Sequence, residues 1–393
     1  MRAEPIHEVG WLGIVLIGLF LLGWGMQRWR LPALLGFMAA GFLLQYLPIP
    51  ILLAPVFPIT GEIALWLLFF FIGLEYSPEN LRTLSRNIAL PGLIDFGISW
   101  GIPVLLSLAL TSFQEALLLG SALYPSSTAI IARLLLDYSR LASAEAELLL
   151  GLLIFEDIVG IGLLGVLTPL SQGEKVSLTW LLRSLGSLGG TIIGFWLLYR
   201  WVIPWLLQRK LPVEEVPFAV LLMLGVVLAI GALGHAVGIS GALFSFLLGV
   251  LIPQESVLFQ MAEKSLAPLR ELSMGLFFFA LSYDISLANL PILSGLGWMS
   301  LAILTKAVAT YWAARVWGLR SRTAFRAALS FIPRGEFSLV FGNLSTAWKG
   351  SVLLMVLGTT AIGTAFFAWA EELTRRLFPR QASSIFRKRP LSN

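Results

Sequence analysis

The sequence lacks cysteine entirely and has little histidine or charge. Without cysteine, the chain has no disulfide, thiolate metal site or cysteine nucleophile. The two histidines, His7 and His235, are too far apart in the sequence to suggest a metal site. Charged residues make up 12% of the 393 positions and hydrophobic residues 58%, whereas soluble domains carry about 25% charged residues. The composition indicates a polytopic membrane protein, and its basic loops explain the net charge of +5 without a nucleic-acid partner.

Apolar windows long enough to cross a bilayer core, roughly 17–25 residues, recur along the chain. We predict an all-α protein with thirteen transmembrane helices, at residues 11–27, 31–47, 59–75, 88–110, 114–135, 145–168, 176–199, 214–232, 236–252, 266–284, 291–314, 323–345 and 351–374. Polar residues 254–265 predict a short interfacial helix that links two halves. Residues 379–393 predict a short cytoplasmic basic tail. We expect neither a cleavable signal peptide nor an attached soluble domain.

The basic residues are unevenly divided between the two sides of this predicted topology. With the N-terminus outside, most of the 27 Lys and Arg residues fall in cytoplasmic segments. The outer side receives only Arg2, Lys175, Arg183 and Lys349. Such a bias sets the orientation of membrane proteins, so we expect the C-terminus to be inside.

Charged side chains also occur in the middle of predicted helices. Glu156 and Asp157 lie near the centre of the sixth window, and Lys306 lies just past the centre of the eleventh. A charge at this depth costs roughly 2.5–3.5 kcal/mol, so it is a candidate for function. The alternatives are a buried structural pair for the acids and a snorkelling side chain for Lys306. Adjacent helical residues project about 100° apart, which argues against one pocket hiding both acids.

Two predicted helices are interrupted by proline at the same depth. The fifth window contains Pro125-Ser126-Ser127-Thr128, and the twelfth contains Pro333-Arg334-Gly335-Glu336. Proline removes a backbone donor and breaks a helix, and a membrane tolerates this where the backbone lines a cavity or is buried in protein. The two windows are seven apart, and an odd offset reverses the direction of crossing. We therefore predict inverted repeats, with broken helices in corresponding positions.

Other polar residues have simpler explanations. We favour an Arg334–Glu336 salt bridge that neutralises the broken helix. The hydroxyls of Ser126, Ser127 and Thr128 either satisfy the break or bind a cation. Solvated or capping roles are expected near helix ends for Glu62, Asp95, His235 and Asp284, and a structural role for Glu75.

Six features occur in the order seen in the monovalent cation:proton antiporter-2 family. They are Phe71-Ile72-Gly73-Leu74-Glu75, Ser126-Ser127-Thr128-Ala129-Ile130, Phe155-Glu156-Asp157, Gly275-Leu276-Phe277-Phe278, Lys306 and Gly335-Glu336-Phe337. The chain resembles this family over essentially its whole membrane part. Within the family it is most similar to the Kef-type potassium/proton antiporters.

The resemblance implies a homodimer in a bacterial cytoplasmic membrane, with a mobile core and a dimerisation scaffold. The core would comprise about 88–170 and 291–378, and the scaffold about 11–75 and 176–284. The two broken helices would cross within the core. Kef-type proteins usually also carry a nucleotide-binding RCK domain, which has no counterpart in this sequence. A separate regulatory subunit, a removed domain and the absence of such regulation are the three explanations.

The resemblance also assigns roles to the midplane charges. Asp157 matches the essential aspartate that carries the cation and the proton, and Lys306 matches the core lysine that pairs with the preceding acid. That preceding residue is Glu156 here, where relatives often have Gln, Asp or Asn. The resemblance therefore fixes neither the stoichiometry nor gating by glutathione.

We expect a secondary active transporter, not an enzyme, that exchanges potassium for protons by alternating access. Cation and proton would compete at Asp157, with neutral oxygens from Ser127, Thr128 and the backbone, while Glu156 would form a switchable pair with Lys306.

A sodium/proton antiporter of the same fold is the alternative. A cation channel is a distant one, because the sequence lacks a Thr-Val-Gly-Tyr-Gly filter. A membrane enzyme would need His or Cys near the acids, and a structural protein would not need the acids. We expect no cofactor and no metal beyond the transported cation, with lipid as the surrounding partner.

Overall fold

The computed structural model describes residues 5–29, 31–46, 56–76, 78–171, 176–204, 219–236, 240–283, 285 and 290–378. The regular elements of these residues are all helical. They are α1 (Pro5–Arg28), α2 (Ala33–Leu44), α3 (Val56–Leu74), α4 (Pro78–Phe96), η1 (Gly97–Gly101), α5 (Ile102–Ser107), α6 (Phe113–Leu123), α7 (Thr128–Asp137), α8 (Ala146–Ser171), α9 (Leu178–Leu197), η2 (Leu198–Val202), α11 (Ala219–Ala236), α12 (Gly241–Leu251), α13 (Val257–Tyr283), α14 (Ile292–Trp317), α15 (Ser321–Ser330), α16 (Glu336–Asn343) and α17 (Lys349–Leu377). The predictions for Asp284 and for residues 379–393 lie outside the described residues.

Each of the thirteen predicted windows contains helix, so the all-α prediction is confirmed. Seven helices in the described part of the chain are long and apolar enough to cross a membrane, and shorter apolar helices accompany them. The protein is therefore a multi-pass membrane protein. The number of crossings, thirteen, stays a prediction.

The predicted separate interfacial helix at 254–265 is wrong. Residues from Val257 onward belong to α13, which continues without interruption to Tyr283. The polar stretch contains good helix formers such as Met261, Ala262 and Glu263, and α13 continues through Pro268, which lies between this stretch and the apolar part. Polarity indicated that this stretch lies at an interface, but the helix does not end where the polarity changes.

The fourth predicted helix begins earlier than its apolar window. It starts at Pro78, passes through a π-helical turn at η1 and ends at Ser107. Pro103 lies just after this turn, and a proline cannot donate its backbone hydrogen bond. As a result Asp95 is not near a helix end but in the middle of a long continuous helix, followed by the buried Ser99 in η1.

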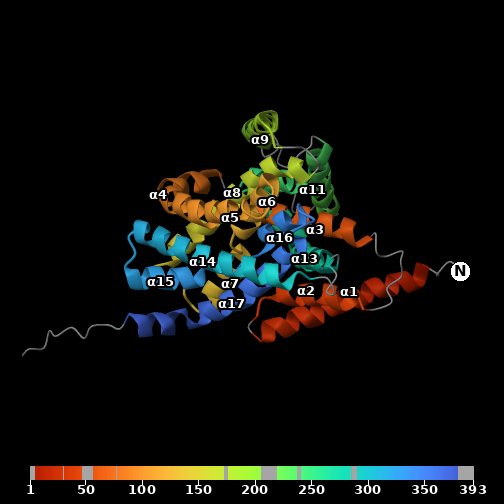
Figure 1. Ribbon diagram of the computed structural model, residues 1–393. Helices are drawn as coiled ribbons and strands as arrows, with labels where there is room; N and C mark the ends of the chain where they lie inside the picture. The colour runs from red at the N-terminus through yellow and green to blue at the C-terminus, as the bar shows by residue number, and fades with distance from the viewer. Residues whose placement is uncertain are drawn as a thin grey trace, which may run out of the picture.

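The helices pack into two sets. In one set, α3 packs against α12 and α13, α13 also contacts α2, and α11 packs against α12. In the other, α14 packs against α4, α15 and α17, while α6, α7 and α16 contact α8. Figure 1 shows α4, α14 and α15 on one side of the molecule and α2, α3 and α11 on the other, with α8 and α16 between them.

Candidate functional site

Two broken helices meet at the centre of the molecule. The first is α6 followed by α7, and the second is α15 followed by α16. Their extended segments form an antiparallel bridge between Ser126 and Arg334. The backbone N–H of Ser127 donates to the carbonyl of Pro333 at 2.9 Å. The predicted breaks at Pro125 and Pro333 are confirmed, and the breaks contact each other directly.

Side-chain hydroxyls satisfy the carbonyls that the breaks expose. Ser126 donates to the carbonyl of Phe331 at 3.3 Å, and Ser338 donates to that of Pro125 at 3.3 Å. Thr360, on α17, donates to the carbonyl of Arg334 at 2.8 Å. Buried backbone groups must be paired, and here the protein itself provides the partners. These hydroxyls therefore stabilise the crossing.

Gly335 is required because the two segments approach so closely. A Cβ atom at this position would lie 2.5 Å from the Cβ of Ser127, closer than two carbon atoms can pack. Its φ of −149° is accessible to any residue. Steric space at the crossing, not backbone conformation, therefore demands glycine here.

Lys306 is the centre of a buried charge cluster. Its Nζ lies 2.6 Å from Oε1 of Glu156 and 2.9 Å from Oδ2 of Asp95, and it also reaches Oδ1 of Asp95 at 3.2 Å. The side chains of all three residues are fully buried. Nζ also lies 4.9 Å from the ring centroid of Tyr124, a favourable position for a cation. The predicted Glu156–Lys306 contact is present, and the snorkelling alternative for Lys306 is wrong.

The predicted solvated or capping role of Asp95 is wrong. Asp95 is fully buried, pairs with Lys306 and accepts a hydrogen bond from Ser99 at 3.3 Å. Asp95 is far from a helix end because the helix that starts at Pro78 continues through η1 and α5 to Ser107.

Asp157 has different surroundings from its neighbour. Its Oδ2 accepts hydrogen bonds from the hydroxyl of Tyr76 at 2.5 Å and from the hydroxyl of Thr128 at 3.1 Å. Its Oδ1 is buried and has no hydrogen-bond partner in the part of the chain that the structure describes. No ion pair involves Asp157 among the described residues. An unpaired buried carboxylate oxygen beside a hydroxyl is suited to hold a proton or a desolvated cation.

The predicted Arg334–Glu336 salt bridge is wrong. The buried guanidinium of Arg334 donates to the hydroxyl of Ser126 and to the carbonyl of Ala302, each at 3.1 Å. Glu336 begins α16 and accepts from the hydroxyl of Ser127 at 3.2 Å. The Ser127 hydroxyl also accepts from the N–H of Ile130 and so caps α7. It is therefore committed to the crossing, and only Thr128 of the predicted hydroxyl pair binds Asp157.

Glu156 also contacts the first break. The backbone N–H of Ser126 donates to Oε2 of Glu156 at 2.5 Å, and the Ser126 hydroxyl lies 3.5 Å from Oε1. A backbone donor leaves no trace in the sequence, so this contact could not be predicted. It attaches the carboxylate to the crossing as well as to Lys306.

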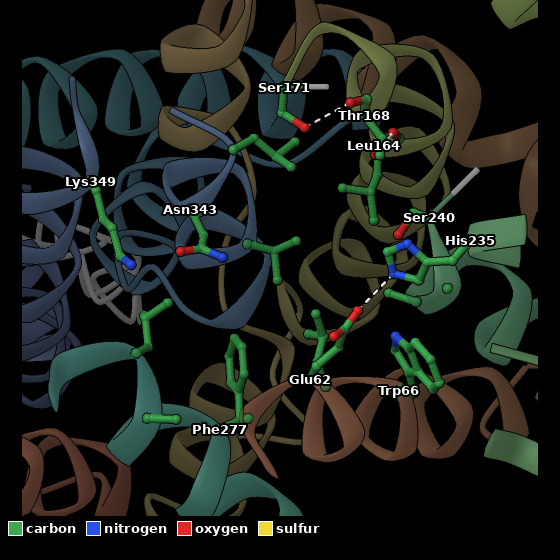
Figure 2. A pocket seen from close by; sticks show the side chains of 18 residues that line it. Glu62, Trp66, Leu164, Thr168, Ser171, His235, Ser240, Phe277, Asn343 and Lys349 are labelled. Atoms are coloured by element: carbon green, nitrogen blue, oxygen red, sulfur yellow. Dashed lines mark hydrogen bonds and ion pairs between the residues drawn. The ribbon is translucent and has the colours of Figure 1, made fainter. Parts of the chain in front are cut away.

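A cavity of about 470 Å³ lies between the two helix sets. Figure 2 shows the Glu62–His235 pair on one wall, with Asn343 and Lys349 facing it from the other. Nε2 of His235 lies 2.7 Å from Oε1 of Glu62, and both side chains are about half exposed. The solvated environment expected for Glu62 and His235 is therefore confirmed, and their contact is new.

The cavity does not reach Asp157, which is 1% exposed. Leu164 in its wall lies about two helical turns beyond Asp157 on α8. In this interval the ring of Phe337 packs against that of Phe69, with centroids 4.7 Å apart. Phe337 also lies against Gly160, where a Cβ would be 3.2 Å from the ring.

The comparisons with known proteins agree with this geometry. A family model described as the transmembrane sodium/hydrogen exchanger matches residues 14–370. The chain belongs to this family. It is therefore a secondary transporter that exchanges a monovalent cation for protons, as predicted, and not an enzyme.

Two relatives span most of the exchanger. An ammonium/proton antiporter subunit, AmhT of Alkalihalophilus pseudofirmus, is 25% identical over 391 residues, covering 96% of this chain and 97% of that protein. A potassium/proton antiporter subunit, KhtU of Bacillus subtilis, is 29% identical over 290 residues, covering 73% and 71%. The sodium proton antiporter MjNhaP1 of Methanocaldococcus jannaschii superimposes with a TM-score of 0.67 at 17% identity, covering 95% and 99% of the two chains. The predicted antiporter-like fold is confirmed.

The charges of the exchanger's centre do not balance. Four buried carboxyl groups, those of Asp95, Glu156, Asp157 and Glu336, face the two buried basic groups of Lys306 and Arg334. Full ionisation would leave an excess of negative charge away from water, which is costly. A proton or a bound cation would offset this excess.

Proposed function

We propose that the chain exchanges potassium for protons and that Asp157 is the carrier site. A proton or a desolvated cation binds the Asp157 carboxylate, and each excludes the other. The unpartnered Oδ1 of Asp157 supports this assignment, because a buried acceptor with no donor is costly until a ligand occupies it. The Thr128 hydroxyl supplies a neutral oxygen beside it.

Glu156 and Lys306 keep a different role in this mechanism. Their pairing, shared with Asp95, holds the lysine charged beside the carrier site. Lys306 thereby contributes a positive field that offsets the negative charge of Asp157 when the site is empty.

Alternating access follows from movement of one helix set against the other. The core, about 88–170 and 291–378, would move against a scaffold of about 11–75 and 176–284. The packing of α14 with α4, α15 and α17, and of α3 with α12 and α13, supports this division. The cavity of Figure 2 lies between the two sets and would give access from one side.

The exchanger functions as a homodimer in the bacterial cytoplasmic membrane, with the N-terminus outside and the C-terminus inside. The distribution of basic residues supports this orientation. A separate cytoplasmic RCK-type subunit is the proposed regulator, and the relatives described as antiporter subunits support a partner chain.

Potassium is the favoured cation because the Bacillus subtilis relative is a potassium/proton antiporter subunit. Sodium is the second candidate, because the family is described by sodium exchange and MjNhaP1 is a sodium proton antiporter. Ammonium belongs in the same assay, because the Alkalihalophilus relative is an ammonium/proton antiporter subunit.

Exchange in proteoliposomes tests the proposal. With a pH-sensitive dye inside, adding potassium outside an acid-loaded vesicle should release protons through the wild-type protein. Asp157→Asn should lower the rate at least 100-fold, because an amide neither carries a proton nor balances a cation. Asp137→Asn, at an exposed position paired with Arg133, is the matched control and should exchange normally. Retained exchange in Asp157→Asn would show that another group carries the ions, and sodium and ammonium arms would identify the cation.

A further inference from the structure

The hydrogen bond between Tyr76 and Asp157 joins the two helix sets. Tyr76 lies two residues beyond Leu74, the last residue of α3, and α3 packs against α12 and α13. Asp157 lies on α8, which packs against α4, α6, α7 and α16. The phenol of one helix set therefore contacts the carrier site of the other, and its hydroxyl lies 2.5 Å from the Asp157 carboxylate.

Tyr76 is held firmly by its own set. Its backbone N–H donates to the carbonyl of Gly73 at 3.1 Å. Its ring lies 5.9 Å from that of Phe246 on α12, measured between centroids. The side chain is 6% exposed, so water does not compete for the hydroxyl. When α8 moves relative to α3, this ring cannot follow it easily and the hydrogen bond must break.

The strength of this bond depends on what Asp157 carries. An ionised carboxylate accepts a charge-assisted hydrogen bond, which is about twice as strong as a neutral one. A proton on Asp157, or a cation that shares its oxygens, removes that advantage. The contact between Phe69 and Phe337 also joins the two sets, but two apolar rings cannot respond to the charge of Asp157.

We propose that Tyr76 is a coupling residue, whose hydroxyl fastens the empty, ionised Asp157 to the α3 set and releases it when a proton or cation binds. This inference rests on the proposed carrier role of Asp157. An exchanger must not move its empty site across the membrane, because the cation would then cross alone. The Tyr76 hydroxyl holds back that one state, while the loaded states move freely.

Tyr76→Phe separates this role from a structural one. The variant keeps the ring and its packing on Phe246 but loses the hydroxyl. Two rates are measured in proteoliposomes with radioactive rubidium as the probe for potassium. The first is exchange of labelled rubidium for unlabelled rubidium, which needs only the loaded site to move. The second is net rubidium uptake into cation-free vesicles at one alkaline pH on both sides with the membrane potential shunted, which needs the site to return empty or protonated.

The expected result is a change in the ratio of these rates. Tyr76→Phe should raise net uptake at alkaline pH on the order of 10- to 100-fold, as expected for one lost hydrogen bond to a charged group. Rubidium self-exchange should stay within about twofold of wild type. Tyr138→Phe removes a hydroxyl at the end of α7, where the ring packs near Phe367, and should leave both rates unchanged.

Equal changes in both rates, or none, would overturn the proposal for Tyr76. Absence of any exchange in the wild type with potassium, sodium and ammonium would instead overturn the proposed function. Hydrogen–deuterium exchange on the unmodified protein is an independent test that does not depend on the variant's folding. Saturating potassium should raise amide exchange at the end of α3, and unchanged protection there would also contradict the release of Tyr76.

Discussion

Glu156 and Asp157 are neighbours in the sequence, yet the protein treats their carboxylates in opposite ways. The carboxylate of Glu156, here called the closed side, has fixed partners. It accepts hydrogen bonds from Nζ of Lys306 on α14 and from the backbone N–H of Ser126 at the crossing. The carboxylate of Asp157, here called the open side, accepts hydrogen bonds from two hydroxyls, one of them from the other helix set. Its second oxygen has no hydrogen-bond partner among the described residues.

This difference follows from the geometry of one helix. Consecutive residues on α8 point about 100° apart, so one carboxylate faces the lysine and the other faces the break at Thr128 and the end of α3. A carboxylate with fixed basic partners is saturated, whereas one with only hydroxyl partners still binds a cation or proton. Under the proposed function, the pair divides charge balance and transport between two adjacent residues.

The largest loss of stability on the closed side is expected when both carboxylates that face Lys306 are removed. Either Asp95→Asn or Glu156→Gln alone leaves the lysine one acidic partner. The double variant leaves a buried charge unpaired, and we expect it to lose about 3–5 kcal/mol of unfolding free energy, which exceeds the sum of the two single losses by about 0.5–3 kcal/mol. Chemical denaturation in detergent micelles measures these values. Adding Lys306→Met should restore stability, and strictly additive losses would show that the two acids do not share the lysine.

Thr128→Val tests the open side, because it keeps the shape of the side chain and removes its hydroxyl. Asp157 then loses a donor and the cation loses a neutral oxygen. We expect the apparent cation affinity to fall about tenfold, as for one hydrogen bond to a charged group. The dependence of exchange rate on potassium concentration measures this. Thr374→Val, whose hydroxyl bonds only within α17, should bind potassium like wild type, and an equal loss in both variants would point to a general packing defect.

The smallest effect is expected from Ser99→Ala on the closed side. The Ser99 hydroxyl donates a hydrogen bond of 3.3 Å to Asp95, but Lys306 contacts both oxygens of the same carboxylate. We expect a loss of about 0.5–1 kcal/mol in unfolding free energy and unchanged exchange. A loss as large as that of Asp95→Asn would mean that Ser99, and not Lys306, positions Asp95.

The sequence predicts those features whose cause is local. Pro125 and Pro333 predict both breaks because proline lacks a backbone donor and crowds the preceding turn. Proline alone does not fix a break, since α4 continues through Pro91 and α13 through Pro268. Glu156 and Lys306 are recognised because a charge in an apolar window needs a partner. For these features the residue type carries much of the information.

Other features depend on distances that no local pattern encodes. Asp95 was misassigned because α4 extends beyond its apolar window. Tyr76 was missed because an aromatic residue at a helix end is typical of a membrane interface, and only the packing of α3 beside α8 brings its hydroxyl to Asp157. Arg334 and Glu336 are close in sequence but lie on either side of the start of α16, so their side chains find different partners.

The hydroxyls that close the helix crossing have a practical consequence for engineering. Ser126, Ser338 and Thr360 complete the crossing, whereas Thr128 alone of the adjoining hydroxyl residues bonds to Asp157. The hydroxyls that stabilise the crossing are thus separate from the hydroxyl that we propose to bind the cation. A library confined to position 128 can search for new cation preferences while the hydroxyls that stabilise the crossing stay in place.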